Sequence, residues 1–483
     1  MMSESTPAIA APGALLDLST GQRLHVVGVG GPGMSAIAIV LAEMGHQVSG
    51  SDIRERSVLD RLRAAGVGVS VGHSRHLVHG CNAVAYSTAI PDRNVELDEA
   101  RHLEVPTLRR AGILASICDQ AKSIGVAGTH GKTTTSSMLM LMFAEAGERP
   151  SFVIGGDVTD VGTGGQWTGG DWFIVEADES DGTHLELPLY ATIVTNVEAD
   201  HLEYYGSLEG IIAGFDRYLA QIDGPKVLCI DDPTCRMLAA RHGAITYGLA
   251  PDADYRAVAL HPADGSYSFR VDRSGVDLGA VHLPLRGEHN VQNATAAIAL
   301  AMSVGIGFEQ CASALARFGG VARRFDVRGR DRGATFVDDY GHLPTEINAV
   351  LAAARGSGDG WRRVIAVFQP NRFNRIAAMW QDYCDAFVHA DLVVLTEIYP
   401  SGTTPIPGVT GKLLVNAVLD AHPDARVVWL PSRPDLIDFI ARTAQDGDVC
   451  ISMGCGDIAT FPGEVLVRRA ELFAATDSSA VGR

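Results

Sequence analysis

Residues 122–147 read KSIGVAGTHGKTTTSSMLMLMFAEAG, and this stretch decides the fold. A short apolar run is followed by a glycine-rich turn and then by a helical pattern, which predicts a strand, a phosphate-binding loop and a helix. Residues 24–52 show the same order, with the loop GVGGPGMS at 28–35 and a second strand that ends at Asp52. One chain therefore carries two glycine-rich loops of the kind that binds phosphate.

Strand and helix patterns keep alternating along the 483 residues, which is typical of α/β domains with doubly wound sheets. Residues 252–285 differ, because short alternating strands there suggest an antiparallel patch. The pattern changes again at VARRFDVRGR (321–330). We therefore predict an α/β protein of three domains in series: an N-terminal Rossmann-like domain (1–120), a central P-loop-type ATPase domain (121–322) and a C-terminal Rossmann-like domain (323–483).

The composition excludes several classes of protein. The chain is 46% apolar and 20% charged, and its net charge is −18. This acidity disfavours a nucleic-acid partner, although a glycine loop with a few local cations can still bind small anions. The eight cysteines form no C-x-x-C pair, so a zinc site is not expected and a reducing compartment is indicated. The sequence shows no signal-peptide pattern and no apolar run of about 18 residues, so we expect a cytoplasmic protein without a membrane partner.

The first loop has the pattern Gly28-x-Gly30-x-x-Gly33, follows a strand and opens a helix. Glycines let the backbone approach a pyrophosphate, and the helix N-terminus favours its charge. We expect a nucleotide diphosphate here, with Asp52 near a ribose; the alternative is an ordinary tight turn. The motif does not distinguish a nicotinamide dinucleotide from a UDP-sugar.

The second loop departs from the standard P-loop, because Val126 stands where that pattern has its first glycine. Backbone N–H groups and the helix start can still hold a triphosphate. Lys132 can reach the terminal phosphates and the Thr133 hydroxyl can face Mg²⁺. The alternative is a chance Gly-Lys-Thr at a helix start, and the apolar strand directly before the loop argues against it.

Acidic and histidine side chains follow two further strands. Glu176 ends WFIVE, and Asp200 and His201 come just past the strand in TIVTNV. The carboxyl ends of parallel strands are where doubly wound sheets present functional groups. We expect Glu176 to bind Mg²⁺ and His201 to hold a second ion. A solvated strand end and a surface histidine are the alternatives.

The last domain contributes three clusters. Arg323 and Arg324 lie at the expected domain boundary, and Arg side chains stabilise phosphoryl charge. VDDYGH places acidic, phenolic and imidazole groups at a strand end, at residues 338–342. Arg372 and Arg375 are three apart, on one helical face if a helix starts there, and could hold a carboxylate. Charged, solvated turns and helix faces are the alternatives.

Together these segments resemble the Mur ligases, the ATP-dependent amide-forming enzymes of peptidoglycan precursor synthesis. The matching segments, between residue 28 and about residue 408, are GVGGPGMS, GTHGKTTT, EADESDG, TNVEADHLEYY, GEHNVQNATAA, RRFD, DDYGHLPTE, FQPNRFNR and EIYPSGTTPIPG, with a weaker match at MGCGDI (453–458). Within the family the chain is similar to the alanine-adding branch. The resemblance implies ATP and Mg²⁺ as cofactors and UDP-N-acetylmuramate and L-alanine as substrates. In the implied reaction the lactyl carboxylate becomes an acyl phosphate, which the alanine amine attacks.

The resemblance also implies roles for individual residues. The implied catalytic residues are Lys132, Glu176, His201 and Arg324. The implied ATP-binding residues are Gly128, Thr129, His130, Gly131, Lys132, Thr133, Thr134, Asn293, Arg324 and Asp339, with Asn293 at the adenine. The implied UDP-substrate residues are Gly30, Gly31, Gly33, Met34, Ser35, Asp52, His73, Ser87 and Thr88. The implied amino-acid residues are Tyr340, His342, Arg372 and Arg375, and the implied Mg²⁺ ligands are Thr133, Glu176 and His201.

Two positions depart from the family pattern: Leu343 replaces the second His of DDYGHHPTE, and Asn371 replaces the His of QPHRF. Both lie near the expected amino-acid site. A recycling ligase that adds a preformed peptide to the same UDP-muramate therefore stays open. An NAD-dependent oxidoreductase leaves GTHGKTTT unexplained, and a P-loop switch or motor would hydrolyse ATP without forming an amide. We expect a monomer or a weak homodimer.

Overall fold

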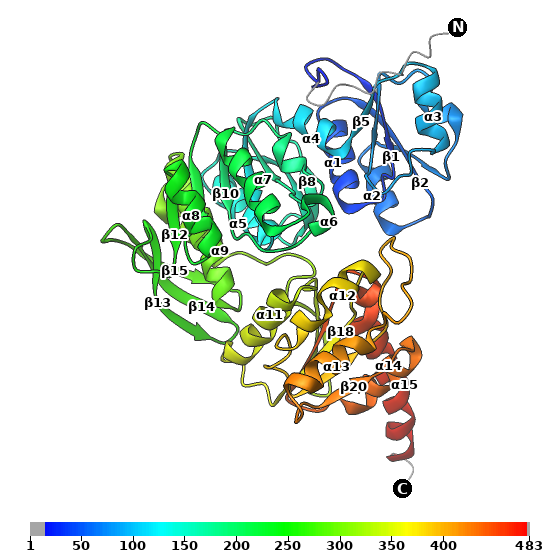
Figure 1. Cartoon of the computed structure of the whole chain (residues 1–483), viewed down its shortest axis with the longest axis vertical. Helices are drawn as coiled ribbons and strands as arrows, with labels where there is room; N and C mark the ends of the chain where they lie inside the picture. The colour runs from blue at the N-terminus through cyan, green and yellow to red at the C-terminus, as the bar shows by residue number, and fades with distance from the viewer. Residues whose placement is uncertain (1–14, 481–483) are drawn as a thin grey trace. The chain divides into compact units, whose positions relative to one another are not determined.

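The computed structural model describes residues 15–480. The expected first and last domains extend into residues 1–14 and 481–483, which lie outside the described residues. The described residues form two compact units: one consists of the residues up to 260 with 269–283 and 291–319, and the other of 261–268, 284–290 and the residues from 320 onward. The first unit holds most of two sheets, and the second unit holds a third sheet (Figure 1).

The first sheet has five parallel strands in the order β3-β2-β1-β4-β5. Its strands are β1 (Arg23–Val27), β2 (Gln47–Asp52), β3 (Gly68–Val71), β4 (Ala83–Tyr86) and β5 (Thr107–Arg109). Its helices are α1 (Pro32–Glu43), α2 (Ser57–Ala64), α3 (Val95–His102) and α4 (Arg110–Cys118). Successive strands are joined through helices or a 3₁₀ turn, as the Rossmann-like prediction requires.

The second sheet has ten strands in the order β15-β14-β13-β12-β11-β10-β6-β9-β7-β8. Its strands are β6 (Lys122–Ala127), β7 (Ser151–Val158), β8 (Thr163–Gln166), β9 (Trp172–Glu176), β10 (Ala191–Val194), β11 (Lys226–Cys229), β12 (Ile245–Gly248), β13 (Tyr255–Ala263), β14 (Ser266–Arg273) and β15 (Val276–Leu283). Its helices are α5 (Lys132–Glu145), α6 (Leu202–Tyr205), α7 (Leu208–Ala220), α8 (Pro233–His242), α9 (Glu288–Ser303) and α10 (Phe308–Ala316). Two-residue turns join β13 to β14 and β14 to β15, and only antiparallel neighbours can be joined so closely. The expected antiparallel patch is confirmed.

The third sheet has six strands in the order β16-β17-β21-β18-β19-β20, parallel except for the edge pair of β16 and β17. Its strands are β16 (Asp326–Asp331), β17 (Ala334–Asp339), β18 (Arg363–Phe368), β19 (Leu392–Leu395), β20 (Val427–Trp429) and β21 (Asp448–Met453). The helices α11 (Pro344–Gly356), α12 (Phe373–Met379), α13 (Lys412–Ala421), α14 (Arg433–Thr443) and α15 (Phe461–Ala480) gather around this sheet (Figure 1).

The first two sheets share one hydrophobic core. Buried side chains from Leu18 to Ala253 form a single cluster that includes residues of both sheets. Helix α1 packs on β2 and also on β7 and β8 of the second sheet. The approach is close, because a Cβ on Gly165 of β8 would lie 2.7 Å from the backbone oxygen of Ala36. This shared core explains why two of the three α/β domains form one compact unit.

The predicted fold class is confirmed: three α/β domains follow one another along the chain, each built on a parallel or mixed sheet. Within the described residues, no helix combines the length and apolar character needed to cross a bilayer.

Candidate active site

The second glycine-rich loop joins β6 to α5, and its backbone requires glycine. Gly128 has a φ of +121°, and a Cβ there would lie 2.2 Å from Thr195 Oγ1 and 2.9 Å from the backbone oxygen of Asn196. Gly131, directly before α5, has a φ of +84°. Left-handed φ values of this kind favour glycine. The loop thereby brings the N-terminus of α5, whose first N–H groups have no partner inside the helix, to the carboxyl edge of the sheet.

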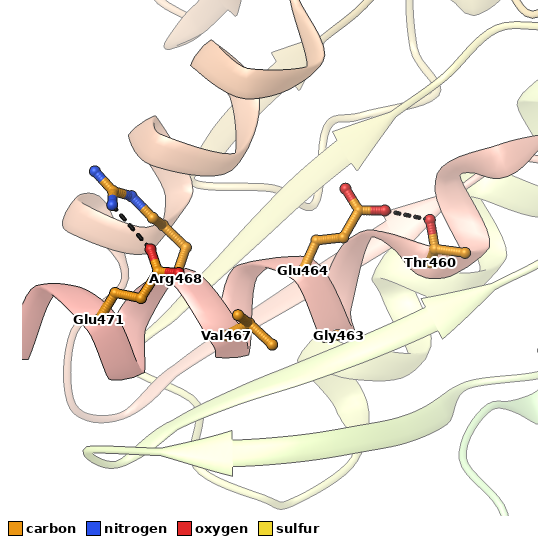
Figure 2. Close-up of a pocket in the computed structure, with 6 residues that line it drawn as sticks. All are labelled: Thr460, Gly463, Glu464, Val467, Arg468 and Glu471. Carbon is orange, nitrogen blue, oxygen red and sulfur yellow. Dashed lines mark hydrogen bonds and ion pairs between the residues drawn. The ribbon is translucent and has the colours of Figure 1, made fainter.

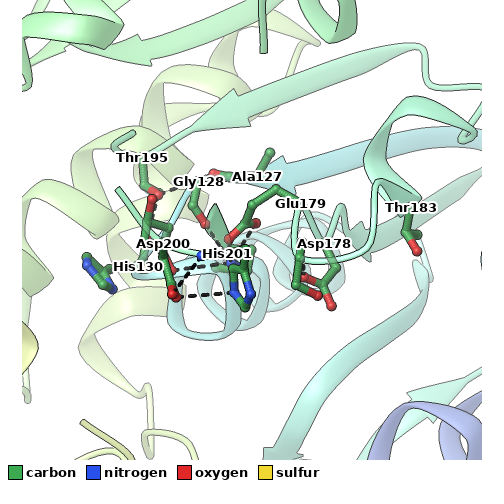
Figure 3. A network of polar contacts seen from close by, with 12 residues as sticks. Ala127, Gly128, His130, Asp178, Glu179, Thr183, Thr195, Asp200 and His201 are labelled. Carbon is green, nitrogen blue, oxygen red and sulfur yellow. Dashed lines mark hydrogen bonds and ion pairs between the residues drawn. The ribbon is translucent and has the colours of Figure 1, made fainter. Parts of the chain in front are cut away.

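The loop after β10 anchors this turn (Figure 3). The backbone N–H of Thr129 donates to the oxygen of Asn196 at 3.1 Å, and the N–H of His130 donates to Asn196 Oδ1 at 2.8 Å. The Thr129 hydroxyl accepts from the N–H of Glu198 at 2.9 Å, and His130 Nε2 lies 3.2 Å from Glu198 Oε2. The side chains of Thr129 and His130 therefore fix the shape of the loop.

Lys132 is the first residue of α5, and its ammonium group turns back onto the loop. Its Nζ donates to the backbone oxygen of Gly128 at 2.6 Å and to Glu179 Oε2 at 2.9 Å. Burial disfavours the charge of Lys132, but Glu179 and Asp178 outweigh it and raise the pKa of Lys132. The ammonium group is therefore charged and faces the turn where a phosphate chain would bind.

Glu179 is a candidate functional residue that the sequence analysis did not single out. It is 4% exposed, follows β9 and holds the Lys132 ammonium with both carboxylate oxygens. Its backbone oxygen accepts from the Tyr205 hydroxyl at 2.8 Å. The segment EADESD contains three acidic residues besides Glu176, namely Asp178, Glu179 and Asp181. Their spacing does not indicate which of them contacts Lys132.

Thr133, Glu176 and His201, the expected Mg²⁺ ligands, come from α5, β9 and the loop after β10. Glu176 ends the strand beside β6, and its Oε1 accepts from the N–H of Gly155 at 2.7 Å. His201 has a φ of +54° and places Nε2 3.2 Å from Asp200 Oδ2. A non-glycine residue with positive φ is uncommon and is often found at functional sites. Thr133 and Glu176 carry oxygen atoms, which are the ligands that Mg²⁺ prefers. Within the described residues, no three His, Cys, Asp or Glu side chains are grouped as a metal site.

Asn293 lies in α9 against the second loop. A Cβ on Gly131 would lie 2.7 Å from Asn293 Oδ1, and Asn293 is 7% exposed. The structure therefore brings the amide of Asn293 to the turn that opens α5. Thr134, in the first turn of α5, is also buried.

The first loop joins β1 to α1, and Asp52 is part of its construction. The N–H of Gly30 donates to Asp52 Oδ2 at 3.0 Å, and a Cβ on Gly30 would lie 2.6 Å from the same oxygen. Asp52 Oδ1 also accepts from the N–H of Arg54 at 3.2 Å. Asp52 thus supports the loop directly, a role that the distance of 19 residues from Gly33 in the sequence could not reveal.

A buried carboxylate holds one of the expected substrate residues beside the first loop. Glu96 is fully buried and lies 2.6 Å from Ser51 Oγ and 3.2 Å from His73 Nδ1. Burial opposes ionisation of Glu96, but hydrogen bonds from His25, Ser51 and Ser74 outweigh it and lower the pKa of Glu96. Glu96 therefore fixes the ring orientation of His73.

The other expected UDP-substrate residues lie around the same loop or one strand away. Ser87 follows β4, and its N–H donates to the oxygen of Val27 in β1 at 3.2 Å. Thr88 is the next residue. Ser35 Oγ donates to the oxygen of Pro32 at 2.9 Å, and Met34 is 2% exposed within the core. The side chain of Met34 is therefore part of the core.

In the second unit, the two arginines of RRFD stack on Tyr340. The guanidinium carbons of Arg323 and Arg324 lie 5.0 Å and 5.2 Å from the ring centroid. Arg323 Nε also donates to Asp338 at 3.0 Å, and its Nη2 donates to the oxygen of Gly454 at 2.7 Å. These two hydrogen bonds hold the guanidinium of Arg323 in place within the second unit.

Asp339 ends β17 and is 3% exposed. Burial raises its pKa to about 6, against the lowering effects of Arg324 and of the N–H groups of Phe325 and Gly341. The folded chain therefore holds this proton to a higher pH than the unfolded chain does. Stability is greatest while Asp339 is protonated and is lost as the pH rises through about 6.

We expect the unfolding free energy of the wild type, relative to Asp339→Asn, to fall by roughly 2–3 kcal/mol between about pH 4 and pH 7. Urea unfolding of both proteins across this range measures the difference. A difference that rises with pH would mean that Asp339 is already ionised in the folded chain at low pH.

The expected amino-acid residues lie at the starts of α11 and α12. His342 Nδ1 is 3.1 Å from Glu346 Oε2. Arg372, directly before α12, has a φ of +62°, and Arg375 is 9% exposed and donates from Nη1 to Asn371 Oδ1 at 3.1 Å. Asn371, which replaces the His of the family pattern, thus positions Arg375.

Leu343, which replaces the second His of the family pattern, directly precedes α11 and is 4% exposed. Its backbone N–H donates to the side chain of Glu346. Its side chain is buried within the second unit.

A hollow on α15 belongs to no predicted site. It is lined by Thr460, Gly463, Glu464, Val467, Arg468 and Glu471 (Figure 2). The Thr460 hydroxyl donates a hydrogen bond to Glu464, and Arg468 Nη1 donates to Glu471 Oε2 at 3.0 Å. These polar groups therefore pair with one another.

Comparison with known proteins agrees with this architecture. Residues 23–122 match the description "Mur ligase family, catalytic domain", residues 126–301 match "Mur ligase middle domain", and residues 323–456 match "Mur ligase, glutamate ligase domain". The UDP-N-acetylmuramate–L-alanine ligase of a Bradyrhizobium species is 42% identical over 446 residues, covering 90% of this chain and 95% of that protein. The ligase of the same name from Rubrobacter xylanophilus is 42% identical, covering 92% of this chain and all of that protein.

Two solved structures have the same fold. The UDP-N-acetylmuramate–alanine ligase of Thermotoga maritima matches with a TM-score of 0.80 at 28% identity, covering 93% of this chain and 99% of that one. A murein peptide ligase from Psychrobacter arcticus matches with a TM-score of 0.66 at 24% identity, covering 92% and 98%. The second likeness shows the fold alone.

The three α/β domains, with a glycine-rich loop in each of the first two, and the matches to ligase domains along the chain together indicate a multidomain ligase. The chain belongs to the Mur ligase family, and the family assignment made from the sequence motifs is confirmed.

Proposed function

We propose that this chain is an ATP-dependent ligase that joins L-alanine to the lactyl carboxylate of UDP-N-acetylmuramate in peptidoglycan precursor synthesis. The observation that carries the proposal is the charged Lys132 on the GTHGKTTT loop, in a chain whose full-length relatives at 42% identity have this name. The chain would work in the cytoplasm, as a monomer or a weak homodimer. Its domains would span residues 1–120, 121–322 and 323–483.

The first chemical step brings two anions together, since the γ-phosphoryl group moves to a carboxylate. Positioning and charge neutralisation should dominate such a step. Lys132 would contact the β- and γ-phosphates, and the N–H groups at the start of α5 would bind the phosphate chain. Thr133 and Glu176 would hold Mg²⁺, which when bound neutralises phosphate charge, and His201 would hold a second ion. Asn293 would contact the adenine.

The second step needs the amino acid. Arg324 and Asp339 would reach ATP from the C-terminal domain, which implies domain closure before chemistry. Tyr340, His342, Arg372 and Arg375 would bind alanine, with an Arg fork on its carboxylate. The alanine amine would then attack the acyl carbon, and phosphate would leave through a tetrahedral intermediate.

Phosphate release from ATP and Mg²⁺ with UDP-N-acetylmuramate, with L-alanine added or withheld, tests the proposal. We expect alanine-dependent release and a product heavier by one alanyl residue. Phosphate release that is stimulated by the free tripeptide, but not by alanine, would favour the recycling ligase. Hydrolysis without any UDP-muramate would favour a nucleotide switch, and reduction of NAD would favour an oxidoreductase.

Replacing Arg372 with alanine is expected to raise the KM for alanine by roughly 10- to 100-fold with little change in the KM for ATP, because a charged hydrogen bond to the substrate carboxylate is lost. Arg372→Lys should recover only part of the loss, since lysine keeps the charge without the fork. The exposed Arg426 provides the control, and Arg426→Ala should behave as the wild type. A rise confined to the KM for ATP would assign Arg372 to the nucleotide.

A further inference from the structure

Arg110, which none of the motifs includes, lies beside the first glycine-rich loop. It is the first residue of α4, directly after β5. A Cβ on Gly33, the last glycine of the loop, would lie 3.6 Å from Arg110 Nη1 and 3.8 Å from its Cδ. The loop itself, GVGGPGMS, contains no lysine or arginine. Arg110 therefore brings a positive charge to the start of α1.

The other end of the same guanidinium is held by the acidic loop after β9. Arg110 Nη2 lies 2.6 Å from Asp178 Oδ2 and 3.4 Å from Asp181 Oδ1. The side chains of Arg110 and Asp178 are 23% and 26% exposed, so a ligand can reach the pair. Burial opposes both charges, but the ion pair outweighs it, raising the pKa of Arg110 and lowering that of Asp178.

The next residue of the acidic loop holds the cation of the other glycine-rich loop. Glu179 bonds Lys132 Nζ at 2.9 Å, while Asp178 bonds Arg110. Asp178 also contributes to the raised pKa of Lys132. Two consecutive carboxylates thus position one cation at each loop, and all these residues belong to the first unit.

We propose that Arg110 binds a phosphate oxygen of the UDP substrate's diphosphate through Nη1 and that Asp178 is the positioning residue that orients it. The inference rests on the proposed function, because it assumes that the first loop takes a nucleoside diphosphate. Glycine N–H groups and a helix N-terminus carry only partial positive charge. A guanidinium beside them adds the directed N–H donors that phosphate binds most strongly. Asp178 and Asp181 contact Nη2 and offset part of its positive charge, so the contribution of Arg110 lies mainly in the hydrogen bonds that Nη1 can donate.

Calorimetric binding of UDP-N-acetylmuramate and of UDP to the full chain, without ATP, tests this role. Arg110→Ala should weaken both ligands by roughly 10- to 100-fold, and Asp178→Asn should weaken both by about 3- to 10-fold. Uridine, which lacks the diphosphate, should bind all variants equally. The affinity for ATP should change by less than about threefold in Arg110→Ala.

The pair Arg61–Asp157 provides a matched control. It also joins an element of the first sheet, α2, to one of the second, β7, at 2.7 Å, but both side chains are nearly half exposed. Arg61→Ala should leave the affinity for UDP unchanged. An unchanged affinity for UDP in a folded Arg110→Ala variant would overturn the proposal, and so would an equal loss for UDP, uridine and ATP, which would make Arg110 a structural link. Failure of the wild type to bind UDP-N-acetylmuramate would instead overturn the proposed function.

Discussion

Replacing Lys132 with alanine is expected to lower kcat by a factor on the order of 1000 or more, while the affinity for UDP-N-acetylmuramate stays within about threefold. Lys132 is charged, lies on the turn that opens α5 and contacts the oxygen of Gly128. Its removal takes a full positive charge from the place where charge must be neutralised during phosphoryl transfer. Steady-state phosphate release and calorimetric binding of the UDP substrate measure the two effects.

The same change leaves Glu179 buried without its cation, and an unpaired buried charge is destabilising. The double variant Lys132→Ala with Glu179→Gln removes both charges and separates the loss of activity from the loss of stability. We expect it to melt at a higher temperature than Lys132→Ala and to remain inactive. Wild-type turnover in either variant would remove Lys132 from the ATP site.

Replacing Gly128 with alanine is expected to be the second most damaging change. A Cβ at this position would meet Thr195 Oγ1 at 2.2 Å and the backbone of Asn196 at 2.9 Å, and the φ of +121° is unfavourable for alanine. The backbone of Asn196 cannot rotate away as a side chain could, so the loop must shift. We expect a loss of roughly 2–4 kcal/mol in stability and a KM for ATP raised by at least about tenfold.

Gly45, between α1 and β2, separates the two causes of this effect. Its φ is +94°, but a Cβ there would meet nothing within 4 Å. Gly45→Ala should therefore cost about 1 kcal/mol and leave the KM for ATP unchanged. Equal melting temperatures and equal KM values for the two variants would show that the close approach to Asn196 does not matter. Thermal unfolding and initial rates at varied ATP provide the comparison.

The sequence predicted the elements that depend on neighbouring residues. The strand, loop and helix at 122–145 and those at 23–43 are confirmed, because apolar runs, glycines and helix patterns act over short distances. The end of the second strand at Asp52 and the antiparallel patch after residue 252 are confirmed for the same reason.

Contacts between residues that lie far apart in the sequence could not be predicted from these local patterns. Lys132 meets Glu179 across 47 positions, and Arg110 meets Asp178 across 68, and neither pairing leaves a periodic signal. The segment HNVQNATAAIALAMSVG (289–305) has the pattern of an amphipathic helix, but in α9 the residues from Asn293 to Ala301 are all buried. Its small side chains, mostly alanine, let neighbouring elements cover it on every side, which a pattern of apolar and polar residues does not express.

The common core of the first two sheets bears on how the chain can be divided. A fragment that ended between the first and second domains would expose the side of α1 that packs on β7 and β8, together with its share of the buried cluster. Exposed apolar surface of this kind promotes aggregation. Chimeras that exchange the nucleotide-sugar domain between relatives would therefore have to carry α1 and its β7–β8 partner surface together. An exchange near Gly319 would also have to carry residues 261–268 and 284–290, which belong to the second unit.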